Sequence, residues 1–213
     1  AGKTTLLKKL MLDKIEQYRV DKRNNRLPVW INLGLNASPV EISELLKYWW
    51  DNQLFLPDTP EKYLKQHNLA LFLDGLNEMP LDSRELRAKT LRAFIEANES
   101  LPVIVTCRTR DYEDDEGLNL GLPVLYVKDL DDARIQAFVR ARRADSLLWD
   151  DIRSDNALYQ MARNPYKLAM LIEVYELSRQ SMQPLPRSID ELYRTYLVQT
   201  YNRYTSQRTR NFV

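Results

Sequence analysis

Residues 69–74 read Leu-Ala-Leu-Phe-Leu-Asp, an unbroken apolar run that is closed by a carboxylate. A strand that is buried on both faces of a parallel sheet is typically apolar along its whole length. Three further short runs have the same character and are also predicted strands: residues 28–33, 101–106 and 123–127. Together the four runs predict the parallel sheet around which this part of the chain is organised.

Segments with helical periodicity separate the predicted strands. Residues 4–20 carry one apolar stripe, formed by Leu7, Met11, Ile15 and Tyr18. Residues 40–50 are predicted to bury Ile42, Leu45, Leu46 and Trp49. A short helix is expected at residues 61–66, and another begins near Asp82 with the apolar side chains Leu86, Leu91, Phe94 and Ile95. This alternation predicts an α/β fold with right-handed crossovers.

The last third of the chain has a different pattern. After a helix capped by Asp131 or Asp132, no further strand is expected from about residue 145 onward. Helical periodicity is found in residues 157–161, 166–177 and 189–201. Ser188 and Glu191 have the spacing of a capping box. The prediction is therefore an α/β domain over residues 1–145 and a helical subdomain over residues 146–213.

Composition excludes several classes of protein. The 213 residues carry a net charge of +1, so no basic field suggests a nucleic-acid partner. No run approaches the ~18 apolar residues of a membrane span. The single cysteine, Cys107, excludes an internal disulfide and fits a reducing compartment, which predicts a cytoplasmic location. His67 is the only histidine, and without a cysteine cluster a zinc site is not expected.

The chain begins with Ala-Gly-Lys-Thr-Thr, the second half of the pattern G-x-x-x-x-G-K-[ST]. In that pattern Gly2 would let backbone N–H groups approach a phosphate, and Lys3 would reach the β- and γ-phosphates. The Thr4 hydroxyl would ligate Mg²⁺, and Thr5 is also predicted to bind the cofactor. The positive end of that helix would face the same anion. A helix that simply starts after a glycine is the alternative for this short motif.

A second motif follows the strand at residues 69–73. Asp74 stands at the carboxyl end of this strand, where ligands bind in open α/β sheets, and its carboxylate is suited to Mg²⁺. Glu78, four residues later, is placed to polarise a water for attack on a γ-phosphate. The alternative is that both acids belong to an ordinary turn that ends a strand.

Two further motifs involve Arg108 and Pro165. The strand at residues 101–106 is followed by Cys107 and Arg108, and this arginine could read the γ-phosphate and stabilise developing charge. Arg110, two residues later, competes for that role. Pro165 follows Asn164 at the start of a predicted helix, which is an ordinary position for proline and carries little weight alone.

In this order and on these elements, the four motifs resemble those of the NACHT-type NTPases, NLR-like proteins in the STAND class of P-loop ATPases. Residues 74–78, Asp-Gly-Leu-Asn-Glu, are similar to that family's Walker B motif, and residues 106–108 to its sensor 1. Asn164 and Pro165 are similar to the proline motif that packs against adenine in relatives. Residues 185–193 resemble the stretch that follows the helical subdomain. The resemblance covers nearly the whole chain.

The resemblance implies a P-loop NTPase fold, a three-layer α/β/α arrangement with strand order 5-1-4-3-2, followed by the helical subdomain. The first strand of that order is missing here and would lie between the strands at residues 102–106 and 124–127. The chain would then be a fragment that starts inside the Walker A motif. We therefore expect these 213 residues to fold poorly when expressed alone.

The resemblance also implies an activity. ATP would bind with Mg²⁺ and be hydrolysed slowly, and exchange or hydrolysis would gate self-association in a defence or innate-immune pathway. The implied roles are phosphate binding by Lys3, Mg²⁺ binding by Thr4 and Asp74, water activation by Glu78, γ-phosphate sensing by Arg108 and adenine packing by Pro165. The sensor and effector domains of relatives would lie outside this chain, and no membrane or nucleic-acid partner is implied.

One departure from the family keeps other functions open. Asn77 replaces the second acidic residue of the usual Walker B motif, so the module could hold nucleotide structurally without turning it over. A GTPase or a small-molecule kinase is a further alternative. GTPases carry an Asn-Lys-x-Asp base reader, which Val127-Lys128-Asp129 matches only in part. The sequence leaves ATP and GTP undecided.

Overall fold

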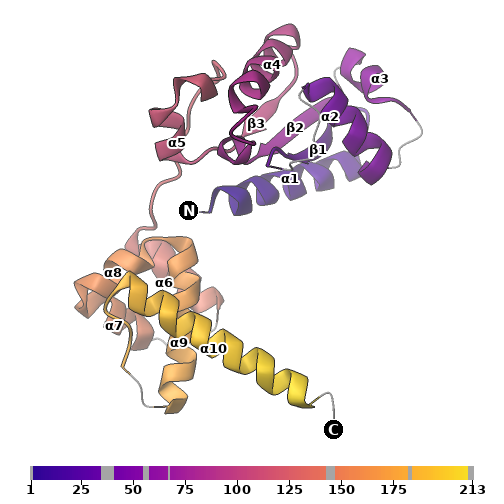
Figure 1. Cartoon of the computed structure of the whole chain (residues 1–213). Helices are drawn as coiled ribbons and strands as arrows, with labels where there is room; N and C mark the ends of the chain where they lie inside the picture. The colour runs from indigo at the N-terminus through magenta and orange to yellow at the C-terminus, as the bar shows by residue number, and fades with distance from the viewer. Residues whose placement is uncertain are drawn as a thin grey trace. The chain divides into compact units, whose positions relative to one another are not determined.

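The computed structural model describes residues 2–34, 41–54, 58–66, 68–142, 147–181 and 184–210, so that His67 lies outside the described residues. The chain divides into two compact units, which are described separately here (Figure 1). The N-terminal unit comprises residues 3–126, and the C-terminal unit comprises residues 127–213 together with residues 1–2. The sequence analysis placed the domain boundary at residue 145.

A three-stranded parallel sheet forms the centre of the N-terminal unit. Its strands are β1 (Leu27–Asn32), β2 (Leu69–Asp74) and β3 (Val103–Val105), in the order β1-β2-β3. Asn32 pairs with Asp74 and Leu73 with Val105, so the strands end close to one another. All six residues of β2 are buried, as its apolar sequence predicts for the middle strand. Three of the four predicted strands are thereby confirmed.

Helices cover both faces of this sheet (Figure 1). On one face, Leu7 of α1 (Lys3–Val20) packs with Ala70 and Phe72 of β2. On the other face, α2 (Ile42–Trp49) and α4 (Arg84–Ala97) pack on a larger core that includes Leu69, Leu71 and Leu73. Alternate residues of β2 thus face opposite layers, and burial of each leucine contributes about 2 kcal/mol.

The helix stripes predicted from sequence are largely confirmed. In α1, Leu7 is buried and Met11, Ile15 and Tyr18 are half-buried, as expected. In α4, Leu91 is buried and Phe94 and Ile95 are half-buried, but Leu86 is exposed and Ala88 takes its place in the core. The residue that precedes α4 is Ser83 rather than Asp82.

The end of α2 corrects the prediction for Trp49. Trp49 is half-buried, whereas Trp50 is only 2% exposed. At Trp50 the chain enters a π-helical turn, η1 (Trp50–Leu54), whose wider spacing brings the next side chain onto the core face. The indole Nε1 of Trp50 donates to the Asp58 carbonyl at 2.5 Å, and its ring lies 5.0 Å from that of Tyr63. Tyr63 belongs to α3 (Pro60–Lys65).

The predicted strand at residues 123–127 is not formed, which is a correction. Its apolar side chains are exposed, and Leu125 is 92% exposed. In the described part of the chain β3 pairs with β2 alone, so residues 123–127 have no neighbouring strand there to satisfy their backbone groups. Between β3 and this segment lie α5 (Thr109–Asp114) and the 3₁₀ turn η3 (Glu116–Leu118).

Five helices form the C-terminal unit among its described residues: α6 (Asp132–Ala141), α7 (Leu147–Ser154), α8 (Asn156–Ala162), α9 (Pro165–Ser181) and α10 (Ile189–Arg210). They share a core of their own, to which α6 contributes Ile135 and Val139. Sequence analysis missed α7, whose only strong signal is the four-residue spacing of Leu148 and Ile152. No helix in the described ranges is both long and apolar enough to cross a bilayer.

Helix caps in this unit follow the sequence. The Asp131 carboxylate accepts from the Arg134 N–H at 2.9 Å and caps α6. The Ser188 hydroxyl accepts from the Glu191 N–H at 3.1 Å, which confirms one bond of the predicted capping box. The Glu191 carboxylate reaches the N–H of Arg187 instead of that of Ser188.

Candidate functional site

The candidate site lies at the carboxyl ends of β2 and β3. The ladder between these strands continues past their ends, because the Thr106 N–H donates to the Leu73 carbonyl at 2.9 Å. In return the Leu76 N–H donates to the Thr106 carbonyl at 2.8 Å. The Gly75 N–H donates to the Thr106 hydroxyl at 3.0 Å. The turn after β2 is therefore fixed directly to the residue that follows β3.

Asp74 is the centre of this arrangement. It is 7% exposed, and its Oδ1 accepts hydrogen bonds from two hydroxyl groups. One is the Thr106 hydroxyl at 2.5 Å, and the other is the Thr4 hydroxyl at 3.1 Å. Thr4 is 70 positions away in sequence and lies in the first turn of α1. The structure thus brings together the two side chains predicted to bind Mg²⁺.

The residues around Thr4 complete the start of α1. Gly2 has a φ of +88°, in the left-handed region that favours glycine. Lys3 is half-buried and Thr5 is exposed. Burial is the main cause that raises the pKa of the Cys107 thiol, while the positive charge of Lys3 acts in the opposite direction and lowers it. Lys3 therefore lies within electrostatic reach of the segment that follows β3.

Glu78 closes the 3₁₀ turn η2 (Leu76–Glu78) and is exposed. Two glycines leave space for its side chain. Gly75 has a φ of +82°, and a Cβ there would lie 2.9 Å from Glu78 Oε2. A Cβ on Gly34 would lie 2.9 Å from the Cβ of Glu78. The observed position of the Glu78 side chain therefore requires a residue without a Cβ atom at positions 34 and 75.

Asn77 connects this turn to Arg108. It is 7% exposed, and its Oδ1 accepts from the Arg108 backbone N–H at 2.9 Å. Its carbonyl accepts from Nη2 of Arg84 at 2.8 Å. Sequence reasoning treated Asn77 only as a departure from a motif and did not identify Arg84. No local pattern could have found either role, because the partners lie 31 and seven positions away.

The two arginines that follow β3 differ in their surroundings. Arg108 is exposed at the start of α5, and Asn77 fixes its backbone. Arg110 forms an exposed ion pair with Asp114, with 3.3 Å between Nε and Oδ2. Such exposed pairs contribute little to stability, yet the pair draws the Arg110 side chain along α5. Arg108 is therefore the better candidate of the two.

Pro165 is the first residue of α9 in the C-terminal unit. Asn164 caps this helix, because its Oδ1 accepts from the N–H groups of Tyr166 at 3.1 Å and of Lys167 at 3.3 Å. These contacts are what any helix start with proline requires. A role for Pro165 in adenine binding stays a prediction.

The donor set at Asp74 fits a Mg²⁺ ion that is shared with phosphate. Among the described residues, no three His, Cys, Asp or Glu side chains converge as a metal-binding group. Mg²⁺ commonly takes only one or two protein ligands and completes its shell with water and substrate phosphates. One carboxylate with an adjacent hydroxyl, beside the start of a helix, matches that pattern.

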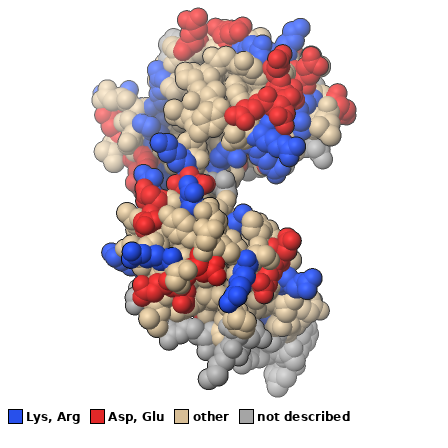
Figure 2. Space-filling view, turned by 90° about the vertical axis from the view of Figure 1, so that its left-hand side faces the viewer, with Lys and Arg blue, Asp and Glu red and all other residues tan. Residues whose placement is uncertain are grey.

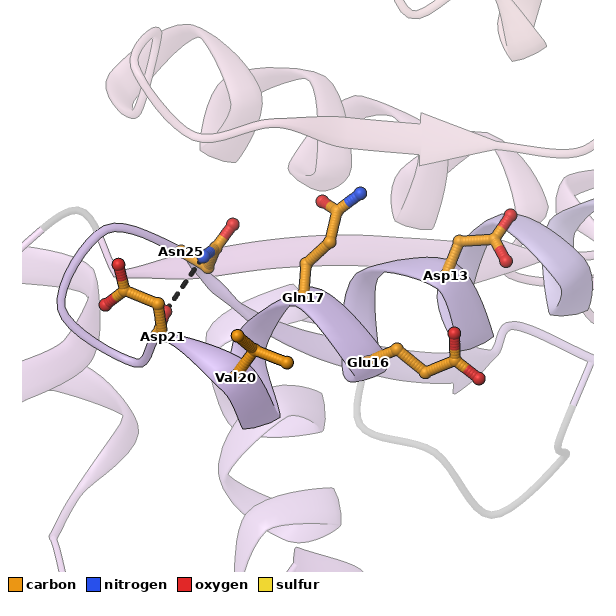
Figure 3. Close-up of a pocket in the computed structure, with 6 residues that line it drawn as sticks. All are labelled: Asp13, Glu16, Gln17, Val20, Asp21 and Asn25. Carbon is orange, nitrogen blue, oxygen red and sulfur yellow. Dashed lines mark hydrogen bonds between the residues drawn. The ribbon is translucent and has the colours of Figure 1, made fainter.

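A shallow hollow elsewhere on the N-terminal unit is not part of this site (Figure 3). It lies along the C-terminal half of α1, and Asp13, Glu16 and Gln17 contribute to its lining. The adjoining turn is held by Asp21, whose carboxylate accepts from Asn24 and whose carbonyl accepts from Asn25 Nδ2 at 2.8 Å. The hollow is separated from Thr4 by most of the length of α1.

Charged side chains of both signs are interspersed on the faces of the two units that Figure 2 shows. Neither sign forms one extended field on the visible faces, in keeping with the net charge of +1. A scan against models of known protein families finds no match for this chain, and a search of curated proteins finds no significant relative.

Proposed function

We propose that the N-terminal unit is a nucleotide-binding module of the P-loop NTPase type, which binds ATP together with Mg²⁺. The observation that carries the proposal is the hydrogen bond from the Thr4 hydroxyl to Asp74, which are 70 positions apart. It joins the two halves of a P-loop site, the end of a Gly-Lys-Thr motif and the acid at the end of a buried strand. The alternative, a helix that simply starts after a glycine, does not explain why Thr4 contacts Asp74.

Each residue has a role that follows from its chemistry. Gly2 leaves backbone N–H groups accessible, and Lys3 places an ammonium group beside the phosphates. Thr4 and Asp74 would hold Mg²⁺, which would neutralise phosphate charge. Glu78 orients and polarises the attacking water, and Arg108 stabilises charge on the terminal phosphate. Thr5, in the first turn of α1, is a further residue that we propose binds the nucleotide.

The finer fold that we propose is a P-loop sheet with one more strand between β3 and residues 123–127. Two observations support it. Within the described residues the far edge of β3 is unpaired, and Ile104 on that strand is 41% exposed. Residues 124–127 have an apolar sequence but are all exposed. Such surfaces are typical of a sheet that lacks a neighbouring strand.

The resemblance to NACHT-type NTPases suggests the use of this site. We propose a slow, regulatory ATPase whose nucleotide state gates self-association, in a cytoplasmic defence or innate-immune pathway. The sensor and effector functions would belong to other domains.

The first test is nucleotide binding by the full-length protein. Lys3→Ala should weaken the affinity for Mg²⁺·ATP at least about 100-fold, because it removes the cation beside the phosphates. Lys14→Ala is the matched control, since it removes an exposed lysine from the same helix. Fluorescence titration with a labelled ATP measures both. Unchanged affinity in the Lys3 variant would refute the site. Competition between ATP and GTP would show which of the two nucleotides the site prefers.

The neutral side chain of Asn77 favours a second candidate, a module that holds nucleotide without turning it over. Phosphate release from the wild type is compared with release from Glu78→Gln. A slower variant supports hydrolysis, whereas equal rates favour the structural role.

A further inference from the structure

We propose, building on the function proposed above, that Asn77 is a positioning residue. It ties the turn that carries Glu78 to the backbone of Arg108, so that the two groups that act on the terminal phosphate are held in one fixed arrangement.

The contacts of Asn77 reach both sides of the site. Its side-chain Oδ1 accepts from the Arg108 N–H at 2.9 Å. The Asn77 backbone also lowers the pKa of the Cys107 thiol, against the larger opposite effect of burial. Asn77 of η2 thus holds the backbone of Arg108 after β3, and Glu78 is the next residue of that turn.

Arg84 also holds this turn through its backbone carbonyls. Its Nη2 donates to the Asn77 carbonyl at 2.8 Å and, at a longer 3.5 Å, to the Met79 carbonyl. Arg84 is the first residue of α4, so the helix that packs on the sheet also anchors the turn. Glu78 therefore lies in sequence between Asn77 and Met79, whose carbonyl groups both accept from the Arg84 guanidinium.

An amide suits this position for a physical reason. The N–H of Arg108 at the start of α5 is satisfied by the buried Oδ1 of Asn77, which supplies an acceptor without charge. A carboxylate would also accept the bond, but it would place a second buried negative charge three residues from Asp74. A leucine has a similar volume and cannot accept a hydrogen bond at all.

The experiment uses three variants of the full-length protein. Asn77→Leu removes the acceptor, Asn77→Asp retains it, and Asn98→Leu is the control. Asn98 follows α4 and donates from Nδ2 to the Phe94 carbonyl at 2.8 Å, away from the ends of β2 and β3. Two quantities are measured for each variant: hydrogen exchange of the Arg108 amide, and ATP turnover alongside Mg²⁺·ATP affinity.

For Asn77→Leu we expect exchange of the Arg108 amide to be at least about tenfold faster, because its acceptor is gone. We expect kcat to fall about tenfold or more while the affinity for Mg²⁺·ATP changes less than about threefold. Asn77→Asp should keep the slow exchange of the Arg108 amide, because a carboxylate also accepts the bond, and Asn98→Leu should change neither quantity. Unchanged exchange in Asn77→Leu overturns the contact, and faster exchange with unchanged kcat overturns the positioning role.

Arg84→Met provides a second route if Asn77→Leu does not fold. It removes the anchor of the Asn77 carbonyl and leaves the side chain of Asn77 in place. A lower kcat at unchanged affinity supports positioning, and an unchanged kcat overturns it. Failure of the proposed function is distinguishable, because the wild type would then bind no ATP. The exchange measurement still decides the contact in that case.

Discussion

At the scale of single residues, the site is organised around one carboxylate oxygen that accepts hydrogen bonds from two donors. Asp74 is buried, and one of its oxygens accepts two hydroxyl hydrogen bonds, from Thr4 and Thr106. Hydrogen bonds to a charged carboxylate are among the stronger ones in proteins. They hold the carboxylate in one orientation before any ligand binds, which lowers the reorganisation that ligand binding would require.

Gly75 is predicted to be essential for the position of Glu78. Gly75→Ala combines a strained left-handed φ with a contact of 2.9 Å to Glu78 Oε2. Gly121→Ala has a similar φ of +70°, but the added Cβ meets no atom within 4 Å. Both variants should lose about 1–2 kcal/mol of unfolding free energy in urea titrations, from the strain alone.

Only Gly75→Ala should also slow phosphate release, because only there must the Glu78 carboxylate move. Equal phosphate release from the two glycine variants would show that the position of Glu78 does not matter.

The reactivity of Cys107 provides a test of where Lys3 lies. Burial is the main cause that raises the pKa of this thiol above its ordinary value of 9.0, so less thiolate is present at neutral pH. Alkylation by iodoacetamide at pH 8 should therefore be slower than for a free cysteine, and its rate should rise only at higher pH.

Removing Lys3 should slow the alkylation of Cys107 further, because the lysine charge lowers the thiol pKa. Lys14→Ala should have no effect, and identical rates in both variants would contradict the placement of Lys3. The raised pKa also makes the free energy of unfolding depend on pH. The contribution of the Cys107 thiol to that free energy is fully present below pH 9.0, and it is lost as the pH rises through the folded-state pKa.

At the scale of elements, β2 could be predicted because its burial is uniform. All six residues at positions 69–74 are buried. A strand buried on both faces is apolar along its length, so composition alone identifies it. Residues 123–127 have a similar composition, but a strand also needs a hydrogen-bonding neighbour, and composition says nothing about that neighbour. Trp49 was wrongly preferred to Trp50 because the π-helical turn η1 breaks the regular helical period on which the prediction depends.

The candidate site was predictable to a similar degree. Thr4 and Asp74 belong to short local motifs, and Asp74 was expected at the carboxyl end of its strand, where ligands bind in open α/β sheets. The part played by Thr106, Asn77 and Arg84 depends on contacts between turns, for which the spacing in sequence gives no signal.

Trp50 is predicted to stabilise the sheet-facing core far more than Trp49. Trp50→Ala removes a side chain that is 2% exposed, together with its indole hydrogen bond to Asp58, and should cost ~3–5 kcal/mol of unfolding free energy. Trp49→Ala should cost clearly less, because that side chain is half-buried. Chemical denaturation of both variants measures the difference. Equal losses would contradict the assigned end of α2.

At the scale of the whole molecule, each unit has its own core, and the N-terminal unit also presents apolar side chains to solvent. Ile104 of β3 is 41% exposed and Leu125 is 92% exposed. Exposed apolar edges of this kind promote association. We expect the 213-residue chain to associate in a concentration-dependent way and to bind the dye ANS.

Leu125→Lys should reduce both association and dye binding, because it places a charge in the exposed segment. Val20→Lys is the control, since it places the same charge on another exposed apolar side chain, 89% exposed, at the end of α1. Sedimentation at several concentrations measures association. Equal behaviour of the two variants would show that residues 123–127 are not involved.

The most direct test of the central claim is the effect of Mg²⁺ on ATP affinity in the wild type and in Asp74→Asn. The substitution keeps the volume of the side chain and removes the charge that would hold the ion. We predict that Mg²⁺ strengthens ATP binding at least about tenfold in the wild type and hardly at all in Asp74→Asn. An equal effect of Mg²⁺ in both proteins, or no ATP binding by the wild type, would contradict the account.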